Sequence, residues 1–172
     1  MSICQKLAAL EKAGKIERFV PQKTGRPARR RLYLACQAIK DFNDPQSATN
    51  LLRIGGFVEA AMTRWVLGER VYGLRRGEFL DRLRPPPPEV WEIRVTAPTP
   101  QVRLFGRFCE IDTLILTNFH TRSFLGKKGS AGWKTAMKTC VEHWEKCLAG
   151  LPLHTGNTIG DYVSENCDAF PI

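Results

Sequence analysis

The sequence predicts an α+β fold in which a small antiparallel sheet packs one face against helices. Three consecutive segments within residues 89–120 alternate apolar and polar side chains, which is typical of adjacent strands. Apolar residues recur at helical spacing before and after these segments, over 51–65 and 133–148. The chain has 172 residues, 43% of them hydrophobic, which is enough for one domain with a genuine core.

Residues 1–36 predict a helix, a strand, a turn and a second strand. Ile3, Leu7 and Leu10 have helical spacing, and Gly14 follows where a left-handed C-cap is favoured. The segments KIERFV and ARRRLYLA flank PQKTGRP, whose composition favours a turn. The stretch resembles the second half of a winged helix-turn-helix domain, without the two helices that normally precede it. Its second strand can equally be the first strand of the main sheet.

Positive charge is concentrated in this segment. The chain carries a net charge of +9, and residues 1–36 hold nine Lys or Arg and two Glu. Such an excess favours a polyanionic partner, nucleic acid above all, and a basic tail kept for solubility is the alternative. The winged-helix resemblance implies that the turn lies along DNA phosphates. The cations expected to bind nucleic acid here are Lys23, Arg26, Arg29, Arg30 and Arg31.

The segment 41–83 predicts further helices. Asp44 suits an N-cap and Pro45 the first turn of a helix whose apolar stripe includes Val58 and Trp65. The segment EFLDRL, residues 78–83, predicts a short helical turn. The four prolines at 85–88 form a stiff extended spacer before the strands.

Alternation divides the side chains of the first two strands between two faces. One face carries Trp91, Ile93, Val95, Val102, Leu104 and Phe108, and the other carries Glu92, Arg94, Arg103, Phe105 and Arg107. The second face suits single-stranded nucleic acid, because cations hold phosphates and the Phe105 ring stacks a base. The alternative is a solvated face whose arginines pair with Glu92 or Glu110.

The third strand, DTLILTNF, runs into the loop HTRSFLGKKGSAG, which is followed by a helix from about Trp133 to Leu148. The loop concentrates positive and titratable groups. These are His120, Arg122, Lys127 and Lys128.

The strands and the helix after them resemble the RelE/ParE superfamily of toxins, and within it the phage-derived HigB-like group. The resemblance covers about residues 45–150 and rests on short motifs: EVWEIRV, then QVRLFGRF, then TLILTNFHTRS. The matching positions are Trp91, Glu92, Arg94, Arg103, Leu116 and Phe119. The loop lacks the Thr-Pro of the family's K-T-P element. The resemblance implies a RelE-like domain over 37–150, preceded by the basic segment 1–36 and followed by a C-terminal tail, 151–172.

The resemblance implies metal-independent cleavage of mRNA, in which the RNA 2′-hydroxyl attacks the neighbouring phosphate. The partners it implies are mRNA, typically bound on the ribosome, and a cognate antitoxin protein. DNA is a further expected partner through residues 1–36. Cations are needed where phosphate charge builds up. The residues expected to supply the chemistry are Arg94, Arg103, Arg107, His120 and Arg122, with Phe105, Lys127 and Lys128 binding the RNA. His120 can act as general acid or base, or can be an ordinary surface side chain.

Other observations limit the classes of function. The sequence shows no P-loop and no dinucleotide fingerprint, so no cofactor is expected. Cys140, His143 and Cys147 share one predicted helix, but structural zinc sites normally use tight knuckles, so no metal is expected either. The six cysteines are expected to be reduced and mostly buried. No apolar run is long enough to cross a bilayer, so a cytoplasmic protein with no membrane partner is expected.

Three functions therefore stay open. The first is the endoribonuclease toxin of a toxin–antitoxin pair. The second is a non-catalytic DNA-binding transcriptional regulator that uses the basic N-terminal segment. The third is a toxin-like fold that acts only as an interaction module.

Overall fold

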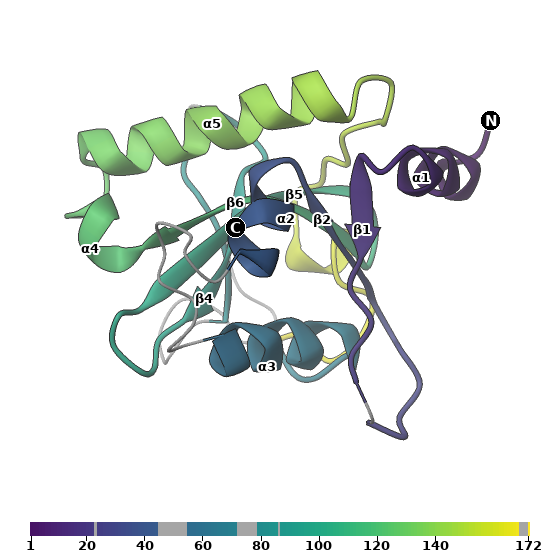
Figure 1. Cartoon of the computed structure of the whole chain (residues 1–172), viewed down its shortest axis with the longest axis horizontal. Coiled ribbons are helices and arrows are strands. Elements are labelled where there is room, and N and C mark those ends of the chain that lie inside the picture. The colour runs from purple at the N-terminus through teal and green to yellow at the C-terminus, as the bar shows by residue number, and fades with distance from the viewer. Residues whose placement is uncertain (23, 45–54, 72–78, 86, 169–171) are drawn as a thin grey trace.

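The fold is a six-stranded sheet between two layers of helices (Figure 1). The computed structural model describes residues 1–22, 24–44, 55–71, 79–85, 87–168 and 172. The strands are β1 (Ile16–Arg18), β2 (Arg31–Ala35), β3 (Leu80–Arg82), β4 (Trp91–Val95), β5 (Val102–Glu110) and β6 (Thr113–Thr121). Their order in the sheet is β1-β2-β6-β5-β4-β3, and only the β2–β6 pairing is parallel. The predicted α+β class is confirmed.

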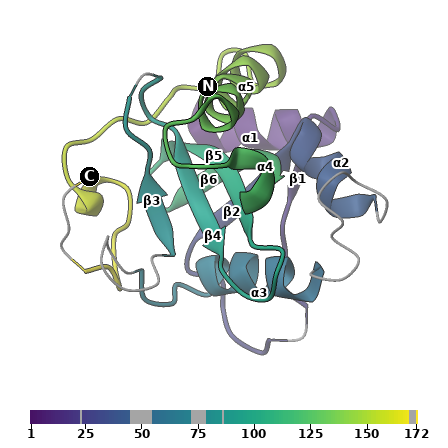
Figure 2. The ribbon, with the colours of Figure 1, turned by 90° about the vertical axis from the view of Figure 1, so that its left-hand side faces the viewer.

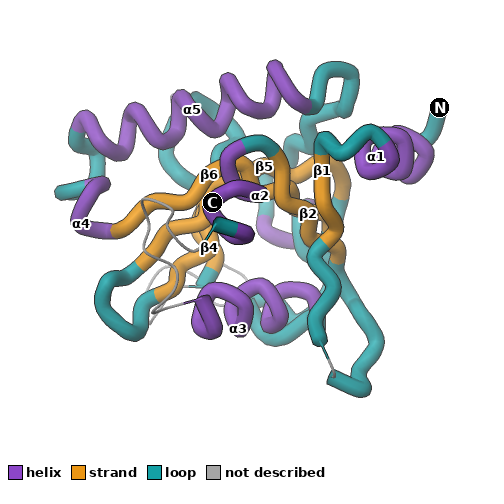
Figure 3. Tube along the Cα trace, viewed as in Figure 1, coloured by secondary structure: helices purple, strands orange, loops and turns teal. Residues whose placement is uncertain are grey.

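Helices cover both faces of the sheet, whereas the sequence predicted helices on one face and an open basic face. The helix α5 (Ala131–Cys147) lies on one side, and α3 (Gly55–Val66) lies on the other (Figures 1 and 3). The reason is visible in β5, where all eight residues from Val102 to Cys109 are buried. A strand whose two faces are both buried lies between two layers. The expected open face is therefore wrong.

The α3 side of the sheet packs the aromatic core. Trp65 and Trp91 meet the ring of Phe108 edge to face, with centroids 5.7 and 5.2 Å away. Tyr162, just after the short 3-10 helix η2 (Ile159–Asp161), packs against both Trp91 and Phe108. Edge-to-face contacts add to the area that aromatic side chains bury. The C-terminal segment is thus part of this core rather than an appended tail.

The α5 side has two apolar clusters. Phe105 packs with Trp133 and Cys140 at one end of α5, while Trp144 packs with Leu7 at the other. Leu7 belongs to α1 (Ile3–Lys12), which begins with a capping box formed by Ser2 and Gln5. The apolar stripe predicted for the last helix is confirmed by its buried residues, which are Trp133, Ala136, Met137, Cys140 and Trp144.

The N-terminal segment joins the main sheet through its second strand. β1 pairs with β2, and β2 then runs parallel to β6 with Arg31 opposite Thr113. The helix α2 (Gln37–Asn43) follows and packs against β6. Of the two possibilities raised by the sequence, the structure has the strand within the sheet.

Two local predictions are corrected, one for a secondary-structure element and one for the cysteines. Residues 80–82 form the edge strand β3 rather than a helical turn, because they pair with β4 in antiparallel register. Asp44 is the C-cap residue of α2. Pro45 and the predicted helix start lie outside the described residues. Cys36 and Cys147 are joined by a disulfide, while Cys109 and Cys140 are buried thiols.

Within the described residues, no helix is both long enough and apolar enough to cross a bilayer.

Candidate functional site

Side chains from neighbouring strands meet on the α5 side of the sheet. The register places Arg94 of β4, Arg103 of β5 and His120 of β6 directly opposite one another. The adjacent row across the sheet consists of Asp81, Glu92, Phe105 and Asn118. Directly opposite residues have Cβ atoms about 5 Å apart. Both rows therefore lie toward the end of the sheet where β6 leads into α4 (Arg122–Leu125). Figure 2 shows α4 with the strands of the sheet.

Glu92 lies between the two arginines. Two like charges directly opposite each other in a sheet are destabilising. Arg94 Nε donates to Glu92 Oε1 over 2.6 Å, and Arg103 Nε lies 3.7 Å from Glu92 Oε2. The carboxyl group thus contacts both guanidinium groups and holds them in the same region of the sheet.

Asp81 ties this arrangement to the loop before α5. It accepts hydrogen bonds from Arg94 over 2.5 Å and from Lys128 over 2.9 Å. Lys128 comes from the connection between α4 and α5, so the contact links β3 to that connection. We call these five residues the charged cluster: Asp81, Glu92, Arg94, Arg103 and Lys128.

Burial changes the titration of the charged cluster. Desolvation raises the pKa of Glu92 to about 8, with Asp81 raising it further and Arg103 opposing the rise. Desolvation also lowers the pKa of Arg94 to about 10 and lowers that of Arg103. Glu92 is thus only partly ionised near neutral pH, and its negative charge does not fully offset the two arginines.

Two buried polar atoms of the charged cluster face each other without a hydrogen bond. Among the described residues, Glu92 Oε2 and Arg103 Nε have no hydrogen-bonding partner. Buried polar atoms are nearly always hydrogen-bonded in folded proteins, so such a pair needs a structural or functional explanation. At 3.7 Å the two atoms form an ion pair that is too long for a hydrogen bond.

His120 is held by three neighbours. Asn118 Nδ2 lies 2.9 Å from His120 Nε2, and with this amide orientation it donates to that nitrogen. Phe105 meets the imidazole edge to face, and the ring of Phe124 stacks on it with centroids 5.0 Å apart. Burial lowers the pKa of His120, so the imidazole is neutral at pH 7.

Arg122 and Lys127 lie in the segment that follows β6. Arg122 donates to the carbonyl of Gly126, and its guanidinium lies over the ring of Trp133, 5.6 Å from the centroid. Lys127 is exposed. Together with Lys128 they place three cations on the loop beside His120.

Arg107 and Phe105 are not available for the roles that the sequence suggested. Arg107 is buried beneath Trp144 of α5 and donates to the carbonyls of Glu89 and Pro88. Phe105 is fully buried between His120 and Trp133. Both point to the same side of the sheet as Arg103, but α5 covers them. The expectation that they face an open surface is therefore wrong.

The N-terminal cations have acidic or carbonyl partners contributed by other parts of the chain. Arg26 pairs with Glu69, Arg29 with Glu165 and Arg31 with Glu110. Arg30 is buried, lies over the ring of Trp65 and donates to the carbonyls of Glu69 and Glu165. It is a structural residue, which removes it from the expected DNA surface. Lys23 lies outside the described residues.

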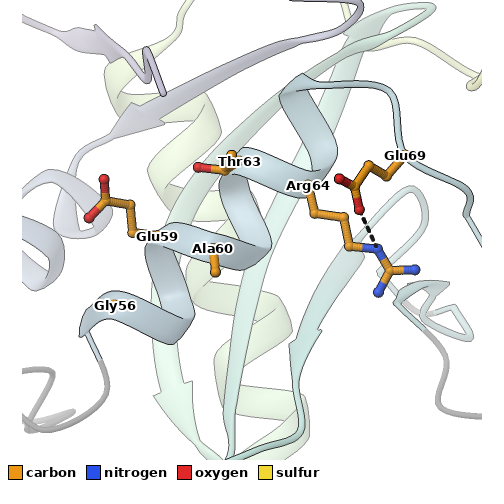
Figure 4. Close-up of a pocket in the computed structure, with 6 residues that line it drawn as sticks. All are labelled: Gly56, Glu59, Ala60, Thr63, Arg64 and Glu69. Atoms are coloured by element: carbon orange, nitrogen blue, oxygen red, sulfur yellow. Dashed lines mark ion pairs between the residues drawn. The ribbon is translucent and has the colours of Figure 1, made fainter. Parts of the chain in front are cut away.

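A hollow of about 520 Å³ lies along α3, on the side of the molecule opposite α5 (Figures 1 and 4). Glu59, Ala60 and Thr63 line it, and the ion pair between Arg64 and Glu69 closes one end. None of the residues predicted for the site lines this hollow. It is separate from the charged cluster.

The part of the chain that the structure describes contains no group of three or more His, Cys, Asp or Glu side chains placed to hold a metal ion. Cys140 and Cys147, which were weighed as ligands, are respectively a buried thiol and half of the disulfide.

Sequence reasoning missed Asp81 and Phe124. Asp81 was assigned to a helical turn, and only the pairing of β3 with β4 places it beside Glu92. Phe124 stands in a segment read as a loop, where a large apolar side chain between cations was the available signal.

Comparison of the chain with protein-family models, curated proteins and solved structures finds no match.

Proposed function

We propose that the protein is a metal-independent endoribonuclease whose active surface is formed by Arg94, His120, Arg122 and Lys128. Arg103 belongs to the same row but is buried behind this surface, so the expectation that it faces the substrate is corrected. The observation that supports this proposal is the register of β4, β5 and β6, which aligns two arginines and a neutral histidine on one side of the sheet. The basic loop closes the same end of the sheet. Positive groups beside a group that can transfer a proton are what phosphodiester cleavage needs.

The proposed reaction is attack of an RNA 2′-oxygen on the adjacent phosphorus. The bond from phosphorus to the 2′-oxygen forms while the bond to the 5′-oxygen of the next nucleotide breaks. The products are a 2′,3′-cyclic phosphate and a 5′-hydroxyl. The proton leaves the 2′-hydroxyl for a base, and the departing 5′-oxygen takes up a proton from water.

His120 is the residue that we assign to proton transfer. A neutral imidazole accepts a proton at pH 7, and the lowered pKa of His120 provides that form. For Nε2 to act as the base, it exchanges its contact with Asn118 for the substrate hydroxyl. Arg94 and Lys128 then stabilise the charge that builds up on the phosphate oxygens.

Glu92 has a positioning role in this proposal. It is fully buried, so it does not meet the substrate directly. Its contacts with Arg94 and Arg103 orient the guanidinium groups, and Asp81 is the second carboxyl group that contacts Arg94. Glu92 therefore aligns the two arginines, while its raised pKa reduces its own negative charge near neutral pH.

The test is cleavage of an end-labelled, single-stranded RNA by the purified protein in EDTA, with analysis of the product ends. We expect cyclic phosphate ends and a rate at least about 100-fold lower for His120→Asn, with RNA binding retained. Arg122→Ala should weaken both binding and cleavage. Arg18→Ala, an exposed arginine on β1 at the far edge of the sheet, is the matched control and should cleave normally.

Cleavage that requires an added divalent ion, or that is unchanged in His120→Asn, would contradict the proposal.

In a cell, the activity would deplete mRNA and inhibit translation, as expected for the toxin of a toxin–antitoxin pair. Induced expression with an RNA-integrity readout tests that role, and loss of growth arrest in His120→Asn would support it.

Binding of duplex DNA through the N-terminal segment is the second proposal. The observation in its favour is that the Arg26 and Arg29 side chains remain more than half exposed, and exposed ion pairs are weak enough to be exchanged for phosphates. Deleting residues 1–36 is not a usable test, because it removes β2 from the sheet. The double variant Arg26→Ala/Arg29→Ala should instead reduce the salt dependence of DNA binding.

A further inference from the structure

Phe124 is an exposed aromatic ring beside the proposed active surface. It is 59% exposed, although it is a large apolar side chain. Its ring lies nearly parallel to the His120 imidazole, at an interplanar angle of 13°. An exposed ring that already stacks on a planar group has the geometry with which proteins bind nucleobases.

The backbone that carries Phe124 is held in place at several points. The Thr121 hydroxyl accepts a hydrogen bond from Phe124 N over 3.3 Å, and Ser130 Oγ donates to Leu125 O over 2.6 Å. Leu125 is buried in the cluster under α5. The exposed ring thus stands on an ordered turn, which limits the conformational entropy that binding would cost.

Positive side chains surround this ring along the chain. Arg122 precedes it by two residues, and Lys127 and Lys128 follow within four. His120 belongs to the row that contains Arg94 and Arg103. A flat ring flanked by cations suits a strand whose bases are free to stack and whose backbone is negatively charged.

We propose that Phe124 stacks an unpaired nucleobase, so that the RNA bound here is single-stranded. In a duplex the bases are stacked on one another and paired, and they do not present a free face to the ring. This inference rests on the proposed function for the identity of the nucleic acid. It replaces Phe105, which is buried, as the aromatic contact.

The test measures binding of a short fluorescein-labelled RNA of mixed sequence, single-stranded or annealed to its complement, by fluorescence anisotropy in EDTA. The RNA carries 2′-O-methyl groups, so the proposed attack by the 2′-hydroxyl cannot destroy it during the measurement. Phe124→Leu keeps an apolar side chain but removes the flat ring, and Phe124→Trp keeps a flat ring. Phe57→Leu is the matched control, because Phe57 is 50% exposed on α3, on the opposite face of the sheet. A strand with abasic sites provides a control on the RNA side.

We expect the wild type to prefer the single strand, and Phe124→Leu to weaken that binding at least fivefold, the effect of losing about 1 kcal/mol of stacking. Phe124→Trp and Phe57→Leu should bind as the wild type does. On the abasic strand, wild type and Phe124→Leu should become equal.

The possible negative results distinguish an error in the stacking role of Phe124 from an error in the proposed nuclease activity. Single-strand binding that is unchanged in Phe124→Leu, or equal binding of the duplex, overturns the stacking role and leaves the proposed cleavage intact. Phe124-dependent binding of single strands without any cleavage of unmodified RNA supports the stacking role and overturns the proposed nuclease. A wild type that binds no RNA, including one that instead binds lipid vesicles or a protein through this ring, overturns both.

Discussion

Glu92 shows how burial decides the behaviour of a single residue. The motif W-E-x-R pairs a glutamate and an arginine on one face of a strand, and the sequence alone allowed an ordinary surface ion pair there. In the fold the glutamate is fully buried, and desolvation opposes its ionisation more strongly than Arg103 favours it. The charge state of this residue therefore depends on pH within the physiological range.

The raised pKa of Glu92 predicts how stability changes with pH. The folded state binds the Glu92 proton up to about pH 8, whereas the unfolded chain releases it near pH 4.5. The folded state thus holds more protons across this window, and the free energy of unfolding falls as pH rises through it. The glutamine in Glu92→Gln stays neutral at every pH. The variant should therefore lack this contribution to the pH dependence of the free energy of unfolding, which is on the order of a few kcal/mol.

Denaturant unfolding of both proteins at pH 5 and pH 8.5 measures the effect. The two should be about equally stable at pH 5, and the variant should be the more stable at pH 8.5. Asp41, whose pKa burial also raises, contributes with the same sign in both proteins and cancels in the comparison. A variant that loses stability relative to wild type at pH 8.5 would show that the ion pairs with Arg94 and Arg103 outweigh burial.

At the scale of elements, the contact between α4 and α5 positions the loop cations and Phe124. It depends on Gly132, near the start of α5. A Cβ atom at this position would lie 2.8 Å from the carbonyl oxygens of both Phe124 and Leu125. These are backbone atoms, so they yield only if α4 moves.

Gly132→Ala is therefore expected to destabilise the protein by about 1–3 kcal/mol, the usual cost of overpacking, despite the better helix propensity of alanine. Gly56 is the matched control: it lies in α3, and no atom of the described residues lies within 4 Å of its Cβ position, so Gly56→Ala should be neutral or slightly stabilising. Thermal unfolding of the wild type, Gly132→Ala and Gly56→Ala measures the two effects on stability. Equal melting temperatures for the two variants would mean that α4 yields at little cost.

Helices and strands whose apolar residues recur at regular spacing were predictable from the sequence, and short elements without such spacing were not. Strands β4 and β5 show period 2 and α5 shows period 3.6 over enough residues to be recognised, although both faces of β5 are buried in the fold. The three residues of β3 carry no period that separates a strand from a helical turn. They become a strand because β4 offers them hydrogen bonds. Asp81, and with it half of the charged cluster's carboxyl groups, could not be placed before that pairing was known.

At the scale of the whole molecule, the same limitation explains the open face that the sequence wrongly predicted. Arg103, Phe105 and Arg107 alternate with apolar residues and so predict a solvated face. The second helical layer covers that face, because Phe105 packs on Trp133 and Arg107 lies beneath Trp144. Arg103, at the end of this face nearest α4, is buried as well, whereas Lys127 and Lys128 in the segment after α4 are exposed. Which part of a polar face stays open depends on long-range packing, which a local pattern does not contain.

The disulfide between Cys36 and Cys147 connects this second layer to the N-terminal part of the sheet. It joins the end of β2 to the end of α5, across 111 residues of sequence. In the chain-entropy model, closing a loop of this length restricts the unfolded chain by about 4–5 kcal/mol, although measured effects are often smaller.

We expect Cys36→Ser to lower the melting temperature by roughly 10 °C, given about 2–4 °C per kcal/mol for a chain of this size. Dithiothreitol should lower the wild type to the level of the variant and leave the variant itself unchanged. Cys4→Ser, at an exposed free cysteine, is the control and should melt as the wild type does in either condition. A wild type insensitive to reductant, with Cys36→Ser equally stable, would mean that α5 is held on the sheet by its apolar stripe alone.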